Sequence, residues 1–469
     1  MTNTIRSINP TTGATLAEHP ALSSADLEQR LARAAAVAPR WRRTPVTERA
    51  AIVGRLGDLL EQEKDRLGRL MTLEMGKPIQ AAIDEAAKCA VGCRFYAEHG
   101  PGFVADRSVD DDGHRSFVAY EPLGVVLAVM PWNFPFWQVI RFAAPALVAG
   151  NVGLLKHASN VPGCALELQS LIERAGAPEG VFQTLLVGSD AVAGILADPR
   201  VAAATLTGSE GAGRSVGQHA GEHLKKTVLE LGGSDAFVVM PSADLRRTVK
   251  TAVQARVINN GQSCIAAKRF IVHQAIAHEF IEGFTAGMRA LRMGDPLDRA
   301  TQLGPLATAR LAEELEAQVT ESVSRGARLL CGGRRTAPGS AFFPPTVLTD
   351  IPRESPAYRD ELFGPVGCVF VARDIDDAIR IANDTRFGLG ASAWTNDAAE
   401  QERFARELDA GSVFVNDMVV SDPRFPFGGV KSSGYGRELS DVGLREFTNV
   451  KTVRIRVQGG ADVAGRTTE

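Results

Sequence analysis

Hydrophobic residues recur with a helical period through much of the first hundred residues. From about Ser24 to about Glu98 the apolar positions stand three or four apart, and Gly76-Lys77-Pro78 interrupts the pattern. This spacing predicts a group of amphipathic helices. Around residues 115–120 the period changes to every second residue, which predicts a strand.

Short runs that are apolar throughout then alternate with helical patterns. We expect strands at residues 125–129, 152–156, 182–187 and 202–207, each followed by a helix. Apolar strands separated by helices are typical of a parallel sheet that is covered by helices on both faces. Many nucleotide-binding domains have this architecture, although architecture alone does not identify a function.

A second alternating set begins at about residue 236 and continues to about residue 416, which predicts a second α/β domain. We expect a strand at Lys268–Val272 and helices near residues 244–258, 275–290, 308–325, 374–383 and 397–408. The segment from Val450 to Val457 alternates apolar and basic residues and predicts an edge strand. Its partner is either the strand near residues 115–120 or another subunit.

Length and composition are those of an ordinary globular protein of two or three domains. The chain has 469 residues, of which 45% are hydrophobic and 23% charged, and its net charge is −3. This balance gives no reason to expect nucleic acid or an anionic membrane as a partner. There is no apolar run of membrane-spanning length, and the first residues lack the features of a signal peptide. Because six cysteines form no disulfide framework in so long a chain, we expect reduced thiols and a cytoplasmic location. Cys89 and Cys93 stand four apart on an expected helix, but no His or Cys pair completes a metal set, so we expect no metal site.

Cys264 ends the segment Asn259-Asn260-Gly261-Gln262-Ser263-Cys264, which lies between an expected helix and an expected strand. The glycine lets the backbone turn sharply, so the sulfur can lie at the floor of a cleft. Taken alone, a cysteine is more often a buried apolar thiol than a nucleophile. Candidate partners elsewhere in the chain favour the nucleophile.

Glu230 and Asn133 are the candidate partners. Glu230 ends an apolar strand just before Gly232 and Gly233, where its carboxylate can act as a general base. The alternative is a solvated or capping carboxylate. Asn133 stands at the first strand-to-helix switch, where its amide can donate to a developing oxyanion. It can equally be the N-cap of a helix that begins near Pro135.

The turn Thr207–Gly213 follows a strand and opens a helix. Its backbone N–H groups and the helix dipole can bind a phosphate. The turn lacks the GxGxxG spacing, so a plain glycine-rich connector is an equal alternative.

These residues occur in the order seen in the aldehyde dehydrogenase superfamily, and the resemblance covers nearly the whole chain. The matching positions are Asn133, Lys156, Thr207–Gly213, Glu230–Gly233, Gly261–Cys264, Glu361–Pro365 and Pro426–Gly429. Within the superfamily the chain most resembles the bacterial succinate-semialdehyde dehydrogenases.

The resemblance implies an α/β fold with a Rossmann-type parallel-sheet cofactor domain, a second α/β catalytic domain and a small β flap for oligomerisation. The implied cofactor domain comprises residues 1–103 and 125–232, and the catalytic domain residues 233–431. Residues 104–124 and 432–469 would form the oligomerisation strands and the C-terminal tail.

The chemistry implied by the resemblance agrees with the local patterns. Cys264, as a thiolate, would attack the aldehyde carbon, and Asn133 with the N–H of Cys264 would hold the oxyanion. Hydride would pass to NAD(P)+ and leave a thioester. Glu230 would then activate the water that releases the carboxylate.

The resemblance also implies the residues that hold the cofactor. Lys156 would bond the adenosine ribose and Ser209 the pyrophosphate. Glu361 would hold the nicotinamide ribose, and Phe363 would pack against that end. A surface lysine, a cap serine, a surface glutamate and a core phenylalanine are the alternatives. The remaining implied cofactor residues are Trp132, Thr207, Gly208 and Leu231.

Ser159 stands where NAD-preferring members of the superfamily often carry a glutamate that grips the ribose 2′-OH. A carboxylate there would repel a 2′-phosphate, whereas a serine offers a donor. We therefore expect NADP to be accepted and preferred over NAD. The alternative is that Ser159 caps the helix near Pro162.

For the substrate, Trp137 and Arg141 follow Asn133 at intervals of four, so the three can form one stripe of a helix. Arg141 can pair with the far carboxylate of a short semialdehyde, or instead with a neighbouring acid of the protein. Phe134 and Ser421 complete the expected substrate site.

The leading hypothesis is the NAD(P)-dependent oxidation of succinate semialdehyde to succinate by a homodimer or homotetramer. Glutarate semialdehyde or an aliphatic aldehyde is an alternative substrate for the same mechanism. Transfer of the acyl group to coenzyme A is disfavoured because Glu230 is present to direct hydrolysis. A cofactor-independent cysteine hydrolase would use the same thiol and base, and the dependence of turnover on NAD(P) distinguishes it.

Overall fold

The N-terminal part of the chain consists of a hairpin followed by helices. The computed structural model describes residues 4–112 and 114–456. The elements of this part are β1 (Thr4–Ile8), β2 (Thr15–Pro20), α1 (Ser24–Arg43), α2 (Val46–Gln62), α3 (Lys64–Met75) and α4 (Ile79–Phe103). Gly76 ends α3 in the left-handed conformation with φ 80°, which confirms the predicted break between the last two helices. The sequence pattern did not predict the hairpin.

A six-stranded sheet has the order β17-β9-β8-β5-β6-β7. Its strands are β5 (Val125–Met130), β6 (Val152–His157), β7 (Phe182–Thr184), β8 (Val201–Thr207), β9 (Lys226–Glu230) and β17 (Gly434–Tyr435). Its helices are α5 (Trp137–Ala149), α6 (Pro162–Arg174), α7 (Ala191–Ala197) and α8 (Glu210–Glu222). The strands are parallel except β17, which pairs antiparallel with β9. Val126, Leu127 and Ala128 are fully buried in β5, which is why this strand is apolar throughout.

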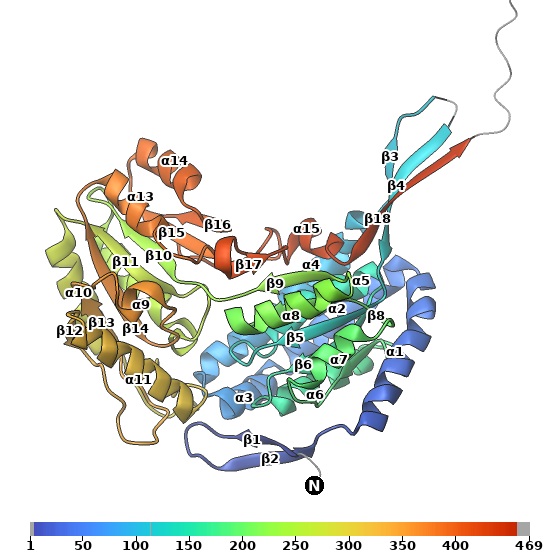
Figure 1. Cartoon of the computed structure of the whole chain (residues 1–469), viewed down its shortest axis with the longest axis horizontal. Helices are drawn as coiled ribbons and strands as arrows, with labels where there is room; N and C mark the ends of the chain where they lie inside the picture. The colour runs from blue at the N-terminus through green and yellow to red at the C-terminus, as the bar shows by residue number, and fades with distance from the viewer. Residues whose placement is uncertain (1–3, 113, 457–469) are drawn as a thin grey trace, which may run out of the picture.

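A seven-stranded sheet has the order β12-β13-β14-β11-β10-β15-β16 and is parallel except at β12. Its strands are β10 (Asp235–Val239), β11 (Ala267–His273), β12 (Arg328–Cys331), β13 (Thr346–Thr349), β14 (Val366–Ala372), β15 (Gly390–Trp394) and β16 (Ser412–Val415). Its helices are α9 (Leu245–Val257), α10 (Ala277–Arg289), α11 (Ala309–Ser324), α12 (Pro356–Arg359), α13 (Ile375–Asn383) and α14 (Ala398–Glu407). The two sheets form separate halves of the body (Figure 1). The predicted α/β architecture is confirmed.

A three-stranded arm projects from the body beside the first sheet (Figure 1). It comprises β3 (Arg107–Val109), β4 (His114–Pro122) and β18 (Thr448–Arg456), in the order β18-β4-β3. The helix α15 (Ser440–Arg445) precedes β18. Pairing of β18 with β4 confirms the first of the two predicted partners. Val457, the last residue of the predicted strand, lies outside the described residues.

The six cysteines are all free, and Cys89 and Cys93 are buried in the core. Within residues 4–112 and 114–456, no helix is long and apolar enough to cross a membrane. In the same residues, no group of three His, Cys, Asp or Glu side chains is placed to hold a metal ion.

Candidate active site

The loop that carries Cys264 has a backbone that few sequences can adopt. After α9, the short 3-10 turn η1 (Ile258–Gly261) contains Asn259 and Asn260 with φ of 54° and 59°. Asparagine tolerates this left-handed conformation better than most residues. Gly261 follows with φ 75°, and a Cβ there would lie 2.4 Å from the carbonyl carbon of Gly364. Glycine is therefore required by both conformation and space, which explains the Asn-Asn-Gly sequence ahead of Cys264.

Hydrogen bonds fasten this loop to the first half of the molecule. Asn259 donates from Nδ2 to the carbonyl oxygen of Asn133 at 2.7 Å. Asn133 in turn donates from Nδ2 to the carbonyl oxygen of Gln262 at 3.0 Å. An amide nitrogen carries two hydrogens, so Asn133 still has one to offer an oxyanion. Because α5 begins at Trp137 with Phe136 at its N-cap position, the alternative of Asn133 as a helix cap is wrong. The expected three-residue helical stripe is also wrong, since Asn133 precedes the helix.

Lys268 holds the loop of Cys264 through hydrogen bonds to its backbone. Its ammonium donates to the carbonyl oxygens of Ser263 and Cys264, both at 2.8 Å, and lies 3.3 Å from the carboxylate of Glu361. Burial lowers the pKa of Lys268, and Glu361 opposes that shift. This lysine therefore joins the loop of Cys264 to Glu361, an expected cofactor residue, a contact that sequence reasoning missed.

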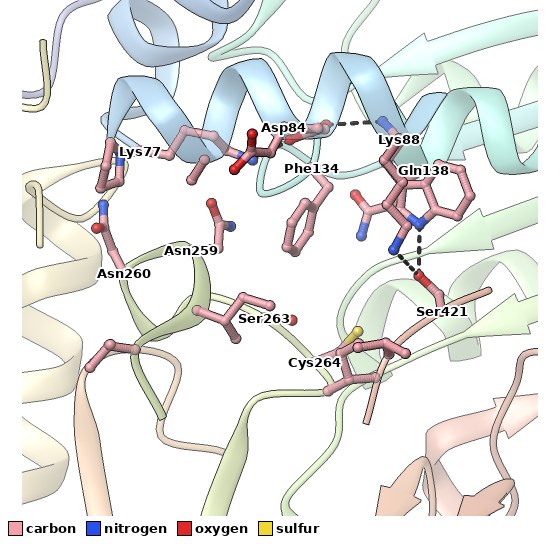
Figure 2. A pocket seen from close by; sticks show the side chains of 18 of the residues that line it. Lys77, Asp84, Lys88, Phe134, Gln138, Asn259, Asn260, Ser263, Cys264 and Ser421 are labelled. Carbon is pink, nitrogen blue, oxygen red and sulfur yellow. Dashed lines mark hydrogen bonds and ion pairs between the residues drawn. The ribbon is translucent and has the colours of Figure 1, made fainter. Parts of the chain in front are cut away.

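Cys264 lies in the wall between two cavities. One cavity of about 440 Å³ is lined by Cys264 together with all four expected substrate residues: Phe134, Trp137, Arg141 and Ser421. Figure 2 shows the sulfur of Cys264 pointing into this space, with Phe134 and Ser421 around it. The second cavity, of about 260 Å³, is lined by Cys264, Asn133 and the expected cofactor residues Trp132, Thr207, Gly208, Ser209, Leu231, Glu361 and Phe363. One thiol can therefore meet ligands from both sides.

The second cavity has groups suited to the nicotinamide end of a dinucleotide. The Trp132 and Phe363 rings meet edge to face with centroids 5.8 Å apart and offer an aromatic wall. Glu361 accepts a hydrogen bond from the N–H of Gly233 at 3.2 Å, and burial raises its pKa. Ser209 is the N-cap of α8, as its alternative stated, and accepts from the N–H of Ala212 at 3.3 Å.

Lys156 and Ser159 lie at the carboxyl end of β6, outside the residues that line this cavity. Burial lowers the pKa of Lys156, and Asp190 opposes the shift. Ser159 is exposed, and α6 begins at Pro162 with Val161 at its N-cap position. The alternative of Ser159 as the cap of that helix is therefore wrong.

Glu230 is buried, with 2% of its surface exposed, so the alternative of a solvated carboxylate is wrong. Its carboxyl lies against Gly428, and neither oxygen has a hydrogen-bond partner in the described part of the chain. Burial raises the pKa of Glu230 well above its ordinary value, and Glu438 raises it further while Arg141 opposes. The residue lines neither cavity, so its side chain must turn toward Cys264 to serve as a base.

Arg141 makes an ion pair with Glu438, and both side chains are buried. Its guanidinium also lies 4.4 Å from the centre of the Phe427 ring. This is the pairing with a neighbouring acid that the sequence left open. Arg141 still lines the larger cavity, but its guanidinium is already paired with the carboxylate of Glu438.

Burial raises the pKa of Cys264 to about 12, with Arg141 and Lys268 opposing the shift. The thiol is therefore protonated at neutral pH before ligands bind. Cys264 is only half-buried and lines both cavities, so ligands can reach its sulfur even though the thiol is protonated.

Fold and site together define an α/β protein with a cysteine between two cavities, and the comparison with known families identifies its class. The aldehyde dehydrogenase family model matches residues 1–453, and the chain belongs to this family. It is 56% identical over 454 residues to succinate-semialdehyde dehydrogenase [NADP(+)] 1 of Mycobacterium tuberculosis (strain ATCC 25618 / H37Rv), covering 96% of this chain and 99% of that protein. It is 55% identical over 465 residues to succinate-semialdehyde dehydrogenase [NADP(+)] of Mycobacterium avium (strain 104), covering 98% of each.

A solved structure gives the same result for the fold. The succinic semialdehyde dehydrogenase from Streptococcus pyogenes, in complex with NADP+, superposes with a TM-score of 0.94 at 34% identity. The match covers 97% of this chain and 100% of that one.

Proposed function

We propose that this chain oxidises succinate semialdehyde to succinate and passes the hydride to NADP+. The observation that carries the proposal is the position of Cys264, which lines the substrate cavity and the cofactor cavity at once. The names of the relatives described above support the substrate and the cofactor. Exposed Ser159, in place of an acid, supports the preference for a 2′-phosphate.

The first half of the reaction acylates Cys264. The Cys264 thiol releases its proton to water, and the resulting thiolate forms a bond to the carbonyl carbon while the carbonyl electron pair moves to oxygen. The Asn133 amide and the backbone N–H of Cys264 stabilise this oxyanion, and Lys268 fixes the loop that presents both sulfur and N–H. Bound NADP+ supplies the hydride acceptor, and Trp132, Ser209, Glu361 and Phe363 would hold it.

The second half releases the acid. Ionised Glu230 takes a proton from water, whose oxygen forms a bond to the thioester carbon, and the carbon–sulfur bond then breaks. Arg141 pairs with Glu438 and also acts electrostatically on Glu230, where its positive charge favours the ionised carboxylate.

The substitution Glu230→Gln separates the two halves. We expect steady-state turnover of succinate semialdehyde to fall by roughly 10²-fold or more, because water loses its base. The first turnover should still release about one NADPH per site, and mass spectrometry should show a succinyl group on Cys264. Glu279→Gln on the exposed face of α10 is the matched control and should behave as the parent protein.

Two outcomes would contradict the proposal. One is succinate formation without NADP+, which would indicate a hydrolase. The other is a Cys264→Ala variant that keeps activity within about tenfold of the parent, since loss of a nucleophile costs far more.

We further propose that the enzyme works in the cytoplasm as a homodimer or homotetramer. Its cofactor domain would comprise residues 1–103 and 125–232, and its catalytic domain residues 233–431. Residues 104–124 and 432–469 would form the oligomerisation strands and the C-terminal tail. The projecting arm supports this assembly, because Val450 and Ile455 of β18 are 61% and 46% exposed.

A further inference from the structure

Three cationic side chains line the larger cavity, and two of them are already paired. They are Lys77, Lys88 and Arg141. Lys77 makes a fully buried ion pair with Glu85, and Arg141 pairs with Glu438. To bind Lys77 or Arg141, the carboxylate of a ligand would have to compete with the protein carboxylate that is already paired with that cation.

Lys88 is different, because within residues 4–112 and 114–456 no carboxylate lies within ion-pair distance of its ammonium. It projects from α4, and its Nζ donates to the hydroxyl oxygen of Ser421 at 2.7 Å. The indole N–H of Trp137 donates to the same oxygen at 3.0 Å. The Nζ also lies 4.5 Å from the centre of the Trp137 ring. Figure 2 shows Lys88 and Ser421 facing one another at the wall of the cavity that holds Cys264.

The half-buried ammonium of Lys88 has no anionic partner within residues 4–112 and 114–456 and could therefore bind a carboxylate from a ligand. Burial lowers the pKa of Lys88 to about 8, with Arg141 adding to the shift and the more distant Glu85 and Asp422 opposing it. Lys88 is therefore mostly protonated at neutral pH, yet poorly solvated. An ammonium carries three hydrogens, so two remain beside the one given to Ser421. An arriving carboxylate would accept them and would offset the cost of burying the charge.

We propose that Lys88, assisted by Ser421 and Trp137, binds the far carboxylate of the semialdehyde while Cys264 attacks its aldehyde carbon. This inference rests on the proposed function and assigns selection of the carboxylate to Lys88 in place of Arg141. Arg141 is instead paired with Glu438 and acts electrostatically on Glu230.

The test compares succinate semialdehyde with butanal, which has the same chain length and lacks the carboxylate. In Lys88→Met we expect kcat/KM for succinate semialdehyde to fall by roughly 100-fold, mainly through KM. For butanal, kcat/KM should stay within about threefold of the parent, because no charge pair is lost. Lys88→Arg should recover most of the selectivity, and inhibition by succinate should weaken in Lys88→Met alone. Lys250→Met, which removes an exposed lysine of α9, is the matched control.

Three results would overturn the inference. An equal loss for both aldehydes in Lys88→Met would show a merely structural role. A parent protein that prefers succinate semialdehyde and a Lys88→Met variant that keeps the preference would overturn the assignment and leave the proposed function standing. A parent protein with no preference for succinate semialdehyde would overturn both.

Discussion

The protonation state of Cys264 sets the reactivity of the ligand-free protein. Because burial raises its pKa to about 12, the thiolate fraction is small and grows about tenfold per pH unit below that value. We expect alkylation of Cys264 by iodoacetamide to accelerate about tenfold per unit from pH 7 to pH 10. The rate is measured by mass spectrometry of the Cys264 peptide. A plateau below pH 9 would contradict the raised pKa.

Ser159 is expected to decide between the two dinucleotides. In Ser159→Glu a carboxylate would meet the 2′-phosphate, and juxtaposed like charges cost several kcal/mol. We expect the ratio of kcat/KM with NADP+ to kcat/KM with NAD+ to fall at least about 30-fold. Ser324→Glu, an exposed serine at the end of α11, should leave the ratio unchanged. At least tenfold better efficiency of the parent protein with NAD+ would refute the expectation.

At the scale of residues, motifs located the side chains but not their partners. Cys264, Asn133 and the residues that line the cofactor cavity could be named from short patterns in the sequence. The pairing of Arg141 with Glu438 could not, because it joins segments that are distant along the chain. Lys88 belongs to none of the sequence motifs, and only its contacts with Trp137 and Ser421 place it at the cavity.

The conformation of the loop that carries Cys264 depends on its one glycine, Gly261. In Gly261→Ala the new methyl group would collide with the backbone of Gly364, and φ of 75° would be strained. We expect kcat/KM to fall by roughly 10²-fold, since a displacement of about 1 Å at a reacting atom costs this much. Gly221→Ala in α8, where a Cβ would meet nothing within 4 Å, should leave activity unchanged. Equal activity of both variants would contradict the account of the loop.

At the scale of elements, buried strands were predicted from the sequence more accurately than exposed or very short ones. Strands of the parallel sheets are apolar on both faces, so β5, β6, β8 and β11 were predicted to within a few residues. The hairpin β1–β2 was missed because its exposed residues give no continuous apolar signal. Strand β17 has two residues, and its pairing with β9 depends on tertiary contacts alone.

The arm offers an exposed strand edge to another chain. We expect Val450→Asp to weaken assembly, because a charge at the centre of an apolar contact must be desolvated. Light scattering coupled to size exclusion should show a multimeric parent and a smaller variant at micromolar concentration. Val323→Asp, at an exposed valine of α11, is the matched control. A monomeric parent protein would contradict the proposed assembly.

At the scale of the whole molecule, the sequence predicted two α/β units and the pairing of its last strand, and the structure adds how they meet. The loop of Cys264 belongs to the second unit, while Asn133, which it touches, belongs to the first. The contact between Asn133 and the loop of Cys264 joins distant parts of the chain, so no local sequence pattern predicts it.

The stretch 434–456 begins with β17, which pairs with β9 and places Gly434 opposite Glu230. The same stretch ends with β18, which pairs with β4 in the arm. Glu438, between these two strands, acts electrostatically on Glu230. A partner that contacts the arm in the proposed assembly would therefore contact the same stretch of chain that places Glu438 near Glu230. Under the proposed function and assembly, we therefore expect a variant that dissociates to accumulate acylated Cys264, which mass spectrometry of the Cys264 peptide would show.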